Sequence, residues 1–262
     1  MNTERRRHLF VVSVGIRILG VFFLITGLAR AAVVESFSFD TFGGSGSLVI
    51  PDGNPVGVSD TRTVSTSLGP IISLTVSLEI SAQYNGDLYV YLQHEDTWAV
   101  LLNRPGRTGA NPFGYADSGF SVTLTDDSLR QDIHLYRDSV SPAPGAPLTG
   151  AWQPDGRALD PDSVTDAGAR TSTLSGFTGL DPNGAWTLFV ADMSSGGASA
   201  INGWNMEITA VPEPAAATVV CGVALSGFGL WRFWRGRRRS RPDNGMPGVA
   251  ADRRQSHGGG PS

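Results

Sequence analysis

The chain has 262 residues, of which 33 are glycine, 16 are proline and only 17% are charged, a composition typical of turn-rich β proteins. Residues 32–210 hold 20 acidic residues and seven arginines, whereas both ends of the chain are basic. This acidic interior argues against nucleic acid as a partner, because phosphate binding needs a basic surface. The chain has one cysteine, Cys221, and no lysine, which excludes an internal disulfide, a structural cysteine zinc site and lysine nucleophiles.

The N-terminus predicts a secretory signal peptide over residues 1–31. Three arginines at 5–7 precede an uncharged, mostly apolar run at 18–29, and Ala29 and Ala31 form a small-x-small cleavage site. The alternative is a short membrane anchor, but this run is shorter than the roughly 20 residues that span a bilayer. We therefore expect cleavage after Ala31 and export through the inner membrane to the cell surface or the extracellular space.

Residues 32–210 predict an all-β domain. Apolar and polar residues alternate strictly over 72–82, as in a strand with one buried face. Asn85-Gly86 then gives the strongest short hairpin signal, and the alternation resumes over 88–93. Further strands are predicted at 97–102, 120–124, 148–152, 186–190 and 201–209. Many short strands divided by Gly, Pro and Asn turns predict a jelly-roll-like antiparallel β-sandwich.

Two tyrosines within this pattern form a candidate binding surface. Tyr89 and Tyr91 lie on the less buried face of the strand predicted at 88–93. Neighbouring tyrosines on a sheet can contact a sugar or a protein. The alternative is ordinary packing between strands, or cover by a second sheet.

No catalytic residue is predicted in the domain. A subtilisin-type protease needs Asp, His and Ser in one constellation, and neither a G-x-S-x-G elbow nor a Gly-Thr-Ser segment occurs. His94 lies beside two acidic residues in a predicted turn, which favours a solvated side chain. His134 lies in an apparent strand and is expected to face its polar side. We therefore expect no enzymatic activity from this chain.

A long surface loop is predicted at 142–170, interrupted by the short strand at 148–152. The candidate calcium ligands are four carboxylates crowded in this loop: Asp155, Asp160, Asp162 and Asp166. Calcium takes six to eight oxygen ligands, often from flexible, carboxylate-rich loops. The alternative is a solvated acidic loop, since EF-hand spacing is absent. Calcium is the only cofactor for which the sequence offers candidate ligands.

The C-terminal end predicts a membrane-sorting segment at 211–241. Its first part is Val211, Pro212, Glu213 and Pro214. An uncharged, mostly apolar run at 215–231 follows, which as a helix measures roughly 26 Å and predicts a transmembrane segment. The run ends at a basic cluster typical of a cytoplasmic stop, made by Arg232, Arg235, Arg237, Arg238 and Arg239. Residues 242–262 are predicted to be a disordered tail.

This order of elements resembles a PEP-CTERM sorting signal. The resemblance implies an exosortase-type sorting protease in the inner membrane as a partner, with cleavage near the Pro-Glu-Pro sequence. PEP-CTERM proteins tend to occur with exopolysaccharide export, so the resemblance also implies a role in an extracellular matrix. The alternative is an ordinary single-pass anchor.

Ordered motifs across 37–209 resemble the P domain (P/Homo B domain) of proprotein convertases. They are Ile50-Pro51-Asp52-Gly53, the string at 80–92, Pro147-Leu148-Thr149-Gly150 with Trp152, and Asp181-Pro182-Asn183-Gly184-Ala185-Trp186. In convertases this jelly-roll sandwich packs on a subtilisin-like catalytic domain. Two functions are therefore expected: a non-catalytic surface or matrix module that contacts exopolysaccharide, or an accessory domain that docks on a subtilisin-like serine endopeptidase.

Overall fold

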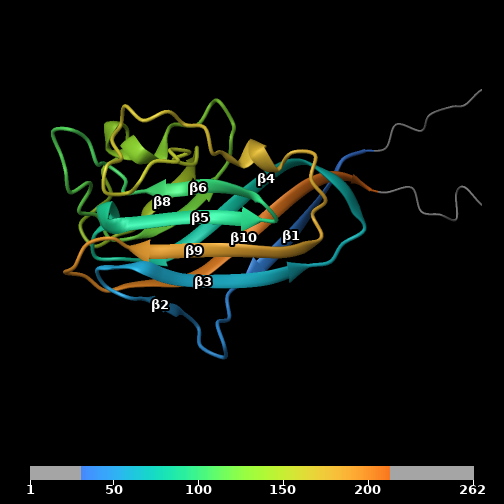
Figure 1. The fold of residues 1–262 in the computed structure, drawn as a ribbon, viewed down its shortest axis with the longest axis horizontal. Helices are drawn as coiled ribbons and strands as arrows, with labels where there is room; N and C mark the ends of the chain where they lie inside the picture. Colours follow the sequence, from blue (N-terminus) through green and yellow to red (C-terminus); the bar gives the residue numbers. More distant parts are fainter. Residues whose placement is uncertain (1–30, 213–262) are drawn as a thin grey trace, which may run out of the picture.

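The computed structural model describes residues 31–212, in which alternating sequences form the strands and short 3-10 helices join them (Figure 1). The strands are β1 (Val33–Phe39), β2 (Leu48–Ile50), β3 (Asn54–Val64), β4 (Leu68–Ser81), β5 (Leu88–His94), β6 (Thr97–Asn103), β7 (Phe120–Leu124), β8 (Leu148–Trp152), β9 (Gly184–Asp192) and β10 (Ser199–Pro212). The 3-10 helices are η1 (Asn85–Asp87), η2 (Ile133–Asp138) and η3 (Leu174–Phe177). Within residues 31–212, none of the helices has the length and apolar character needed to cross a membrane.

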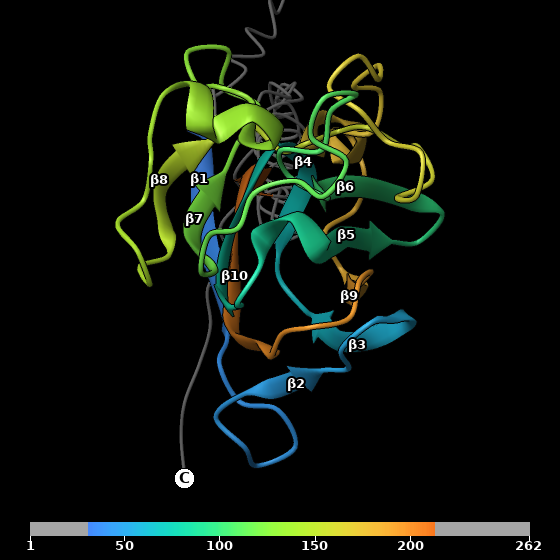
Figure 2. The same cartoon turned by 90° about the vertical axis from the view of Figure 1, so that its left-hand side faces the viewer.

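The strands form two stacked sheets, seen as two layers in Figure 2. One sheet has the order β1-β10-β4-β7-β8, with β2 also paired to β10, and the other has the order β3-β9-β5-β6. Neighbouring strands are antiparallel except β7 and β8, which run parallel. The predicted all-β sandwich is therefore confirmed.

The first and last strands of the domain are direct neighbours. β1 pairs with β10 in antiparallel register, with Val33 opposite Ala210 and Phe39 opposite Trp204. Figure 1 shows the start of β1 and the end of β10 side by side at one end of the sandwich. The two chain segments that flank the domain therefore join it at the same place.

The core lies between the two sheets and comes from the apolar positions of the alternating strands. Leu78 of β4, Leu92 of β5 and Leu188 of β9 have no exposed surface. One predicted core residue, Ile72, is instead 46% exposed, and Ile71 is buried. The pairing shows why: Thr209 lies opposite Ser73 and Ala210 opposite Ile71, so a bulge at Ile72 shifts the alternation by one residue.

The Asn85-Gly86 hairpin prediction is wrong, because β4 and β5 belong to different sheets. Asn85 and Gly86 form part of η1, which carries the chain from one sheet to the other. The buried Asn85 amide donates a hydrogen bond to the carbonyl of Gly119 (3.1 Å) and accepts one from its N–H (2.6 Å). Asn85 thus joins the end of β4 to the start of β7.

The predicted loop at 142–170 also differs from expectation, because its second half packs on β6. Backbone hydrogen bonds join Asp155 N–H to Leu101, Gly156 N–H to Val100, and Val100 N–H to Ser172, at 2.9–3.0 Å. The covered part of β6 is consequently buried on both faces. The segment 154–172 is therefore anchored to the sheet at its two ends, while most residues between 158 and 169 are exposed, as predicted for a surface loop.

Candidate functional site

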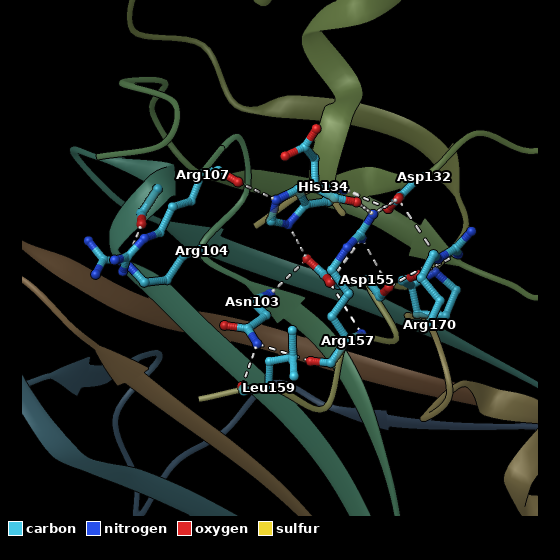
Figure 3. Close-up of polar contacts among 12 residues, drawn as sticks. Asn103, Arg104, Arg107, Asp132, His134, Asp155, Arg157, Leu159 and Arg170 are labelled. Atoms are coloured by element: carbon cyan, nitrogen blue, oxygen red, sulfur yellow. Dashed lines mark hydrogen bonds and ion pairs between the residues drawn. The ribbon is translucent and has the colours of Figure 1, made fainter. Parts of the chain in front are cut away.

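A buried polar cluster lies where the segment 154–172 meets the end of β6, and its centre is the carboxylate of Asp155 (Figure 3). This side chain is completely buried. Its Oδ2 accepts a hydrogen bond from Nδ1 of His134 (2.7 Å) and one from the N–H of Asn103 (3.2 Å). Its Oδ1 lies 3.2 Å from Nη1 of Arg157. A buried carboxylate is costly unless it is paired and hydrogen-bonded, and here both conditions hold.

The two partners of His134 favour its protonated form. Its Nδ1 faces the Asp155 carboxylate and its Nε2 faces the carbonyl of Arg107 (2.8 Å). Because both partners are acceptors, both ring nitrogens must carry a proton to form these bonds. Burial would lower the pKa of His134, but the hydrogen bond and the negative charge of Asp155 outweigh burial and raise this pKa above 6.5.

Two arginines complete the cluster. Arg157 donates to Asp132 (2.8 Å) and to Asp155, and its side chain is 4% exposed. Burial would lower the pKa of Arg157, but its hydrogen bond to Asp132 and the charge of Asp155 outweigh burial and raise it. Arg170 donates to Gln153 (2.7 Å) and to the carbonyl of Asp155 (3.0 Å). These contacts tie the segment 154–172 to Gln153 and to Asp132, the residue that caps η2.

Neither histidine has the environment that the sequence predicted. His134 lies in η2, not in a strand, and is buried. His94 is also completely buried, stacked on Trp186 with ring centroids 4.1 Å apart, and its nitrogens contact the carbonyls of Ala185 and Asp181. Within residues 31–212 neither ring hydrogen-bonds to a serine or cysteine side chain. Both histidines are therefore buried, and both ring nitrogens of each are hydrogen-bonded within the domain.

The four predicted calcium ligands do not converge on one point. Asp155 is already bonded to His134 and Arg157. Asp160 is exposed and accepts the N–H of Asp162, whose own carboxylate is 77% exposed. The side chain of Asp166 is exposed, and only its carbonyl contacts the cluster. Among residues 31–212, no group of three or more His, Cys, Asp or Glu side chains is arranged to hold a metal ion.

The outer face of the β3-β9-β5-β6 sheet carries a row of aromatic rings. Strand pairing places Tyr91 of β5 opposite Phe189 of β9, and their rings stack 4.7 Å apart. Trp98 of β6 meets Tyr91 edge-on at 5.8 Å, and Tyr89 lies 5.9 Å from Tyr91 on the same strand. Of these four residues Trp98 is the most exposed, at 41%, and the other three are partly buried. The two tyrosines therefore pack against neighbouring rings, which is the alternative that the sequence left open. The row also includes Phe189 and Trp98, which the sequence did not indicate.

The strand residues beside these rings are uncharged, whereas the negative charges of Asp155 and Asp160 lie near enough to Tyr89 to help raise its pKa. The strand registers place the following polar residues on the same outer face: Ser59, Thr61 and Thr63 of β3, Thr187 of β9 and Gln93 of β5. Thr61 and Thr187 are joined by a hydrogen bond of 2.9 Å across the two strands. Burial raises the pKa of Tyr89 to about 12, so this phenol is neutral at physiological pH. The outer face is consequently aromatic and hydroxylated, without charge at these positions.

Trp98 also lines a hollow at the edge of this face. The hollow has a volume of about 390 Å³ and lies between the start of β6 and the segment that leads into η3. Its lining residues are Asp96, Thr97, Trp98, Ala158, Thr171, Ser172, Thr173 and Gly176. Four hydroxyl-bearing residues, one indole ring and the acidic residue Asp96 line this hollow. Two of the hydroxyls already have partners within the protein: Ser172 donates to the carbonyl of Trp98 (2.8 Å), and Thr173 bonds to Ser175 (2.9 Å). Periodicity in the sequence cannot reveal this hollow, because it joins strand β6 to a loop more than 70 residues further along the chain.

Several predicted site residues lie outside the described residues. They are Ala29 of the cleavage site, Glu213 and Pro214 of the sorting motif, the transmembrane segment 215–231, and the cluster of Arg232, Arg235, Arg237, Arg238 and Arg239. Ala31 lies just before β1, while Val211 and Pro212 end β10. These predictions concerning export and sorting remain predictions.

The described residues thus define a β-sandwich domain with a buried ionic cluster at one end and an aromatic outer face. No protein-family model matches the chain, and a search of curated proteins finds no match. Among solved structures, the chain is similar to the serine protease of Aeromonas sobria, with 15% identity and a TM-score of 0.39 over 69% of this chain and 27% of the protease. The same protease in complex with its chaperone ORF2 gives 16% identity and a TM-score of 0.38 over 70% and 28%. The chain spans about a quarter of the length of those proteins, and the P-domain resemblance remains a prediction.

Proposed function

We propose that the chain is an exported, non-catalytic β-sandwich module of the cell surface or extracellular matrix. In this proposal the signal peptide directs export, and an exosortase-type protease acts on the C-terminal sorting motif. The observation that carries the proposal is where the folded domain begins and ends. β1 starts at Val33, two residues after the predicted cleavage site, and β10 ends at Pro212, within the sorting motif. Cleavage after Ala31 would remove no strand residue.

The pairing of the terminal strands supports the same proposal. Because Val33 lies opposite Ala210, both flanking segments leave the sandwich at one place. A membrane segment attached there can hold the domain at a surface without interrupting either sheet. The buried state of His94 and His134 further supports a binding or structural role over a catalytic one.

Mass spectrometry of the two termini of the protein, recovered from separated cell fractions, tests this proposal. We expect an N-terminus at Ala32, a C-terminus near Glu213 or an intact membrane-bound tail, and recovery in the envelope or the medium. Ala31→Leu should retain the signal segment, because signal cleavage needs a small residue at this position. Ala82→Ser, placed inside the domain, serves as a control that leaves both termini unchanged.

Two outcomes would contradict the proposal. An intact Met1 on a protein found only in the cytosol would rule out export. Co-purification of a subtilisin-like serine protease with the mature chain, at equal stoichiometry, would favour the alternative role as an accessory domain in proteolysis. Such docking requires a contiguous apolar patch of roughly several hundred Å².

A further inference from the structure

We propose that the hollow beside Trp98 binds a neutral polysaccharide, with the Trp98 ring as the surface on which one sugar residue stacks. This inference deepens the proposed function, since it names the ligand class and the site of a surface module. It depends on three features of the described residues: an exposed indole, several hydroxyl-bearing residues in the lining, and uncharged strand residues on the adjoining sheet face.

The first feature is the exposure of Trp98. A soluble protein usually buries a tryptophan, yet this ring is 41% exposed at the rim of a hollow. Its edge contact with Tyr91, which in turn stacks on Phe189, fixes the indole from one side. A ring held in this way loses little conformational entropy when a ligand packs on it. The apolar C–H face of a sugar ring matches an aromatic surface of this kind.

The second feature is the set of hydroxyl-bearing residues in the lining. Thr97, Thr171, Ser172 and Thr173 line the hollow together with the acidic residue Asp96. Hydroxyls both donate and accept hydrogen bonds, as the hydroxyl groups of a sugar do. The volume of about 390 Å³ lies near the lower end of the ~300–1,000 Å³ that small-ligand sites occupy. The hollow therefore suits one or two sugar residues of a longer chain.

The third feature is charge, which distinguishes neutral from anionic polymers as ligands. From the hollow, the outer face continues over Gln93, Tyr91, Thr187 and Phe189, none of which is charged. The domain as a whole is acidic, with 20 acidic residues against seven arginines over 32–210, so an anionic polymer is repelled within a Debye length of about 8 Å. A proline-rich peptide also docks on aromatic surfaces but does not need several hydroxyl-bearing residues beside them, so it serves as the competing ligand in the test. A neutral polysaccharide is the polymer that satisfies all three features.

Affinity electrophoresis of the full chain in mild detergent tests the inference. The native gels contain hydroxyethylcellulose, laminarin, galactomannan or glycogen as neutral polymers, with alginate as the anionic comparison. We expect retardation by at least one neutral polymer and none by alginate. Trp98→Ala should weaken the binding about tenfold or more, which corresponds to loss of one stacking contact. Trp98→Phe should keep part of the affinity.

A second variant tests the hollow without touching Trp98. A Cβ at Gly176 would lie 3.6 Å from Cγ2 of Thr97, so Gly176→Leu fills the space with little strain and should abolish retardation. Phe113→Ala is the matched control, because Phe113 is a 68% exposed ring outside the hollow, and its removal should change nothing. Near-ultraviolet circular dichroism verifies that each variant is folded.

Three results would overturn the inference. The first is no retardation by any neutral polymer, and the second is retardation that survives both Trp98→Ala and Gly176→Leu. The third is binding to an immobilised proline-rich peptide, in place of polysaccharide, that is lost when the hollow is filled. Each is independent of the terminal masses that test export. Failure of the site and failure of the proposed function can therefore be told apart.

Discussion

Replacing Asp155 by asparagine should destabilise the domain severely, although the change is nearly isosteric. The Asp155 carboxylate is completely buried and contacts His134 at 2.7 Å and Arg157 at 3.2 Å. Asparagine keeps the shape but removes the negative charge, so two buried cationic groups lose a partner. Removing one member of a buried ion pair costs about 3–5 kcal/mol. Because Arg157 keeps its bond to Asp132 (2.8 Å), we expect a loss near the lower limit, about 3 kcal/mol.

Urea unfolding of residues 32–212, followed by tryptophan fluorescence, measures this loss as a lower midpoint at an unchanged slope. The matched control is Asp162→Asn, the same substitution seven residues further along the segment. The Asp162 side chain is 77% exposed and lies 3.7 Å from Arg104, so its removal should cost less than about 1 kcal/mol. The reasoning is refuted if Asp155→Asn costs no more than Asp162→Asn.

Two further predictions concern pH and packing. The raised pKa of His134 means that its protonation stabilises the fold fully below pH 6.5, and that this contribution is lost as the pH rises through the folded-state pKa. His134→Gln should therefore show a smaller decline in the free energy of unfolding above pH 6.5 than the wild type, and an equal decline would contradict this role. Gly86→Ala should cost about 1–3 kcal/mol, because its Cβ would lie 2.3 Å from the carbonyl oxygen of Phe113. A Cβ at Gly109 would meet no atom within 4 Å, so Gly109→Ala should leave the stability unchanged. Equal thermal midpoints of the Gly86→Ala and Gly109→Ala variants would show that the close contact at Gly86 does not destabilise the fold.

The strands β4 to β10 follow from local sequence, whereas β1, β2 and β3 were not predicted. Leu78 and Leu92 were predicted from alternation alone, and both are buried. The exception, Ile72, fails because a bulge depends on how β4 pairs with β10, and the sequence of β4 does not contain that information. Likewise, Tyr89 and Tyr91 are on the predicted face, but their stacking partner Phe189 is 98 residues away from Tyr91 and is brought there only by the strand register.

The sequence by itself therefore determined the class of the domain and the approximate limits of seven of the ten described strands, but not β1, β2 or β3. Only the tertiary structure decided the environment of the polar residues. His134 has apolar sequence neighbours, yet its hydrogen-bond partners are Asp155 and the carbonyl of Arg107, each more than 20 residues away. The physical reason is that alternation records burial, which a residue shares with its strand, whereas hydrogen bonds and charge pairing depend on atoms that approach only when the sheets stack.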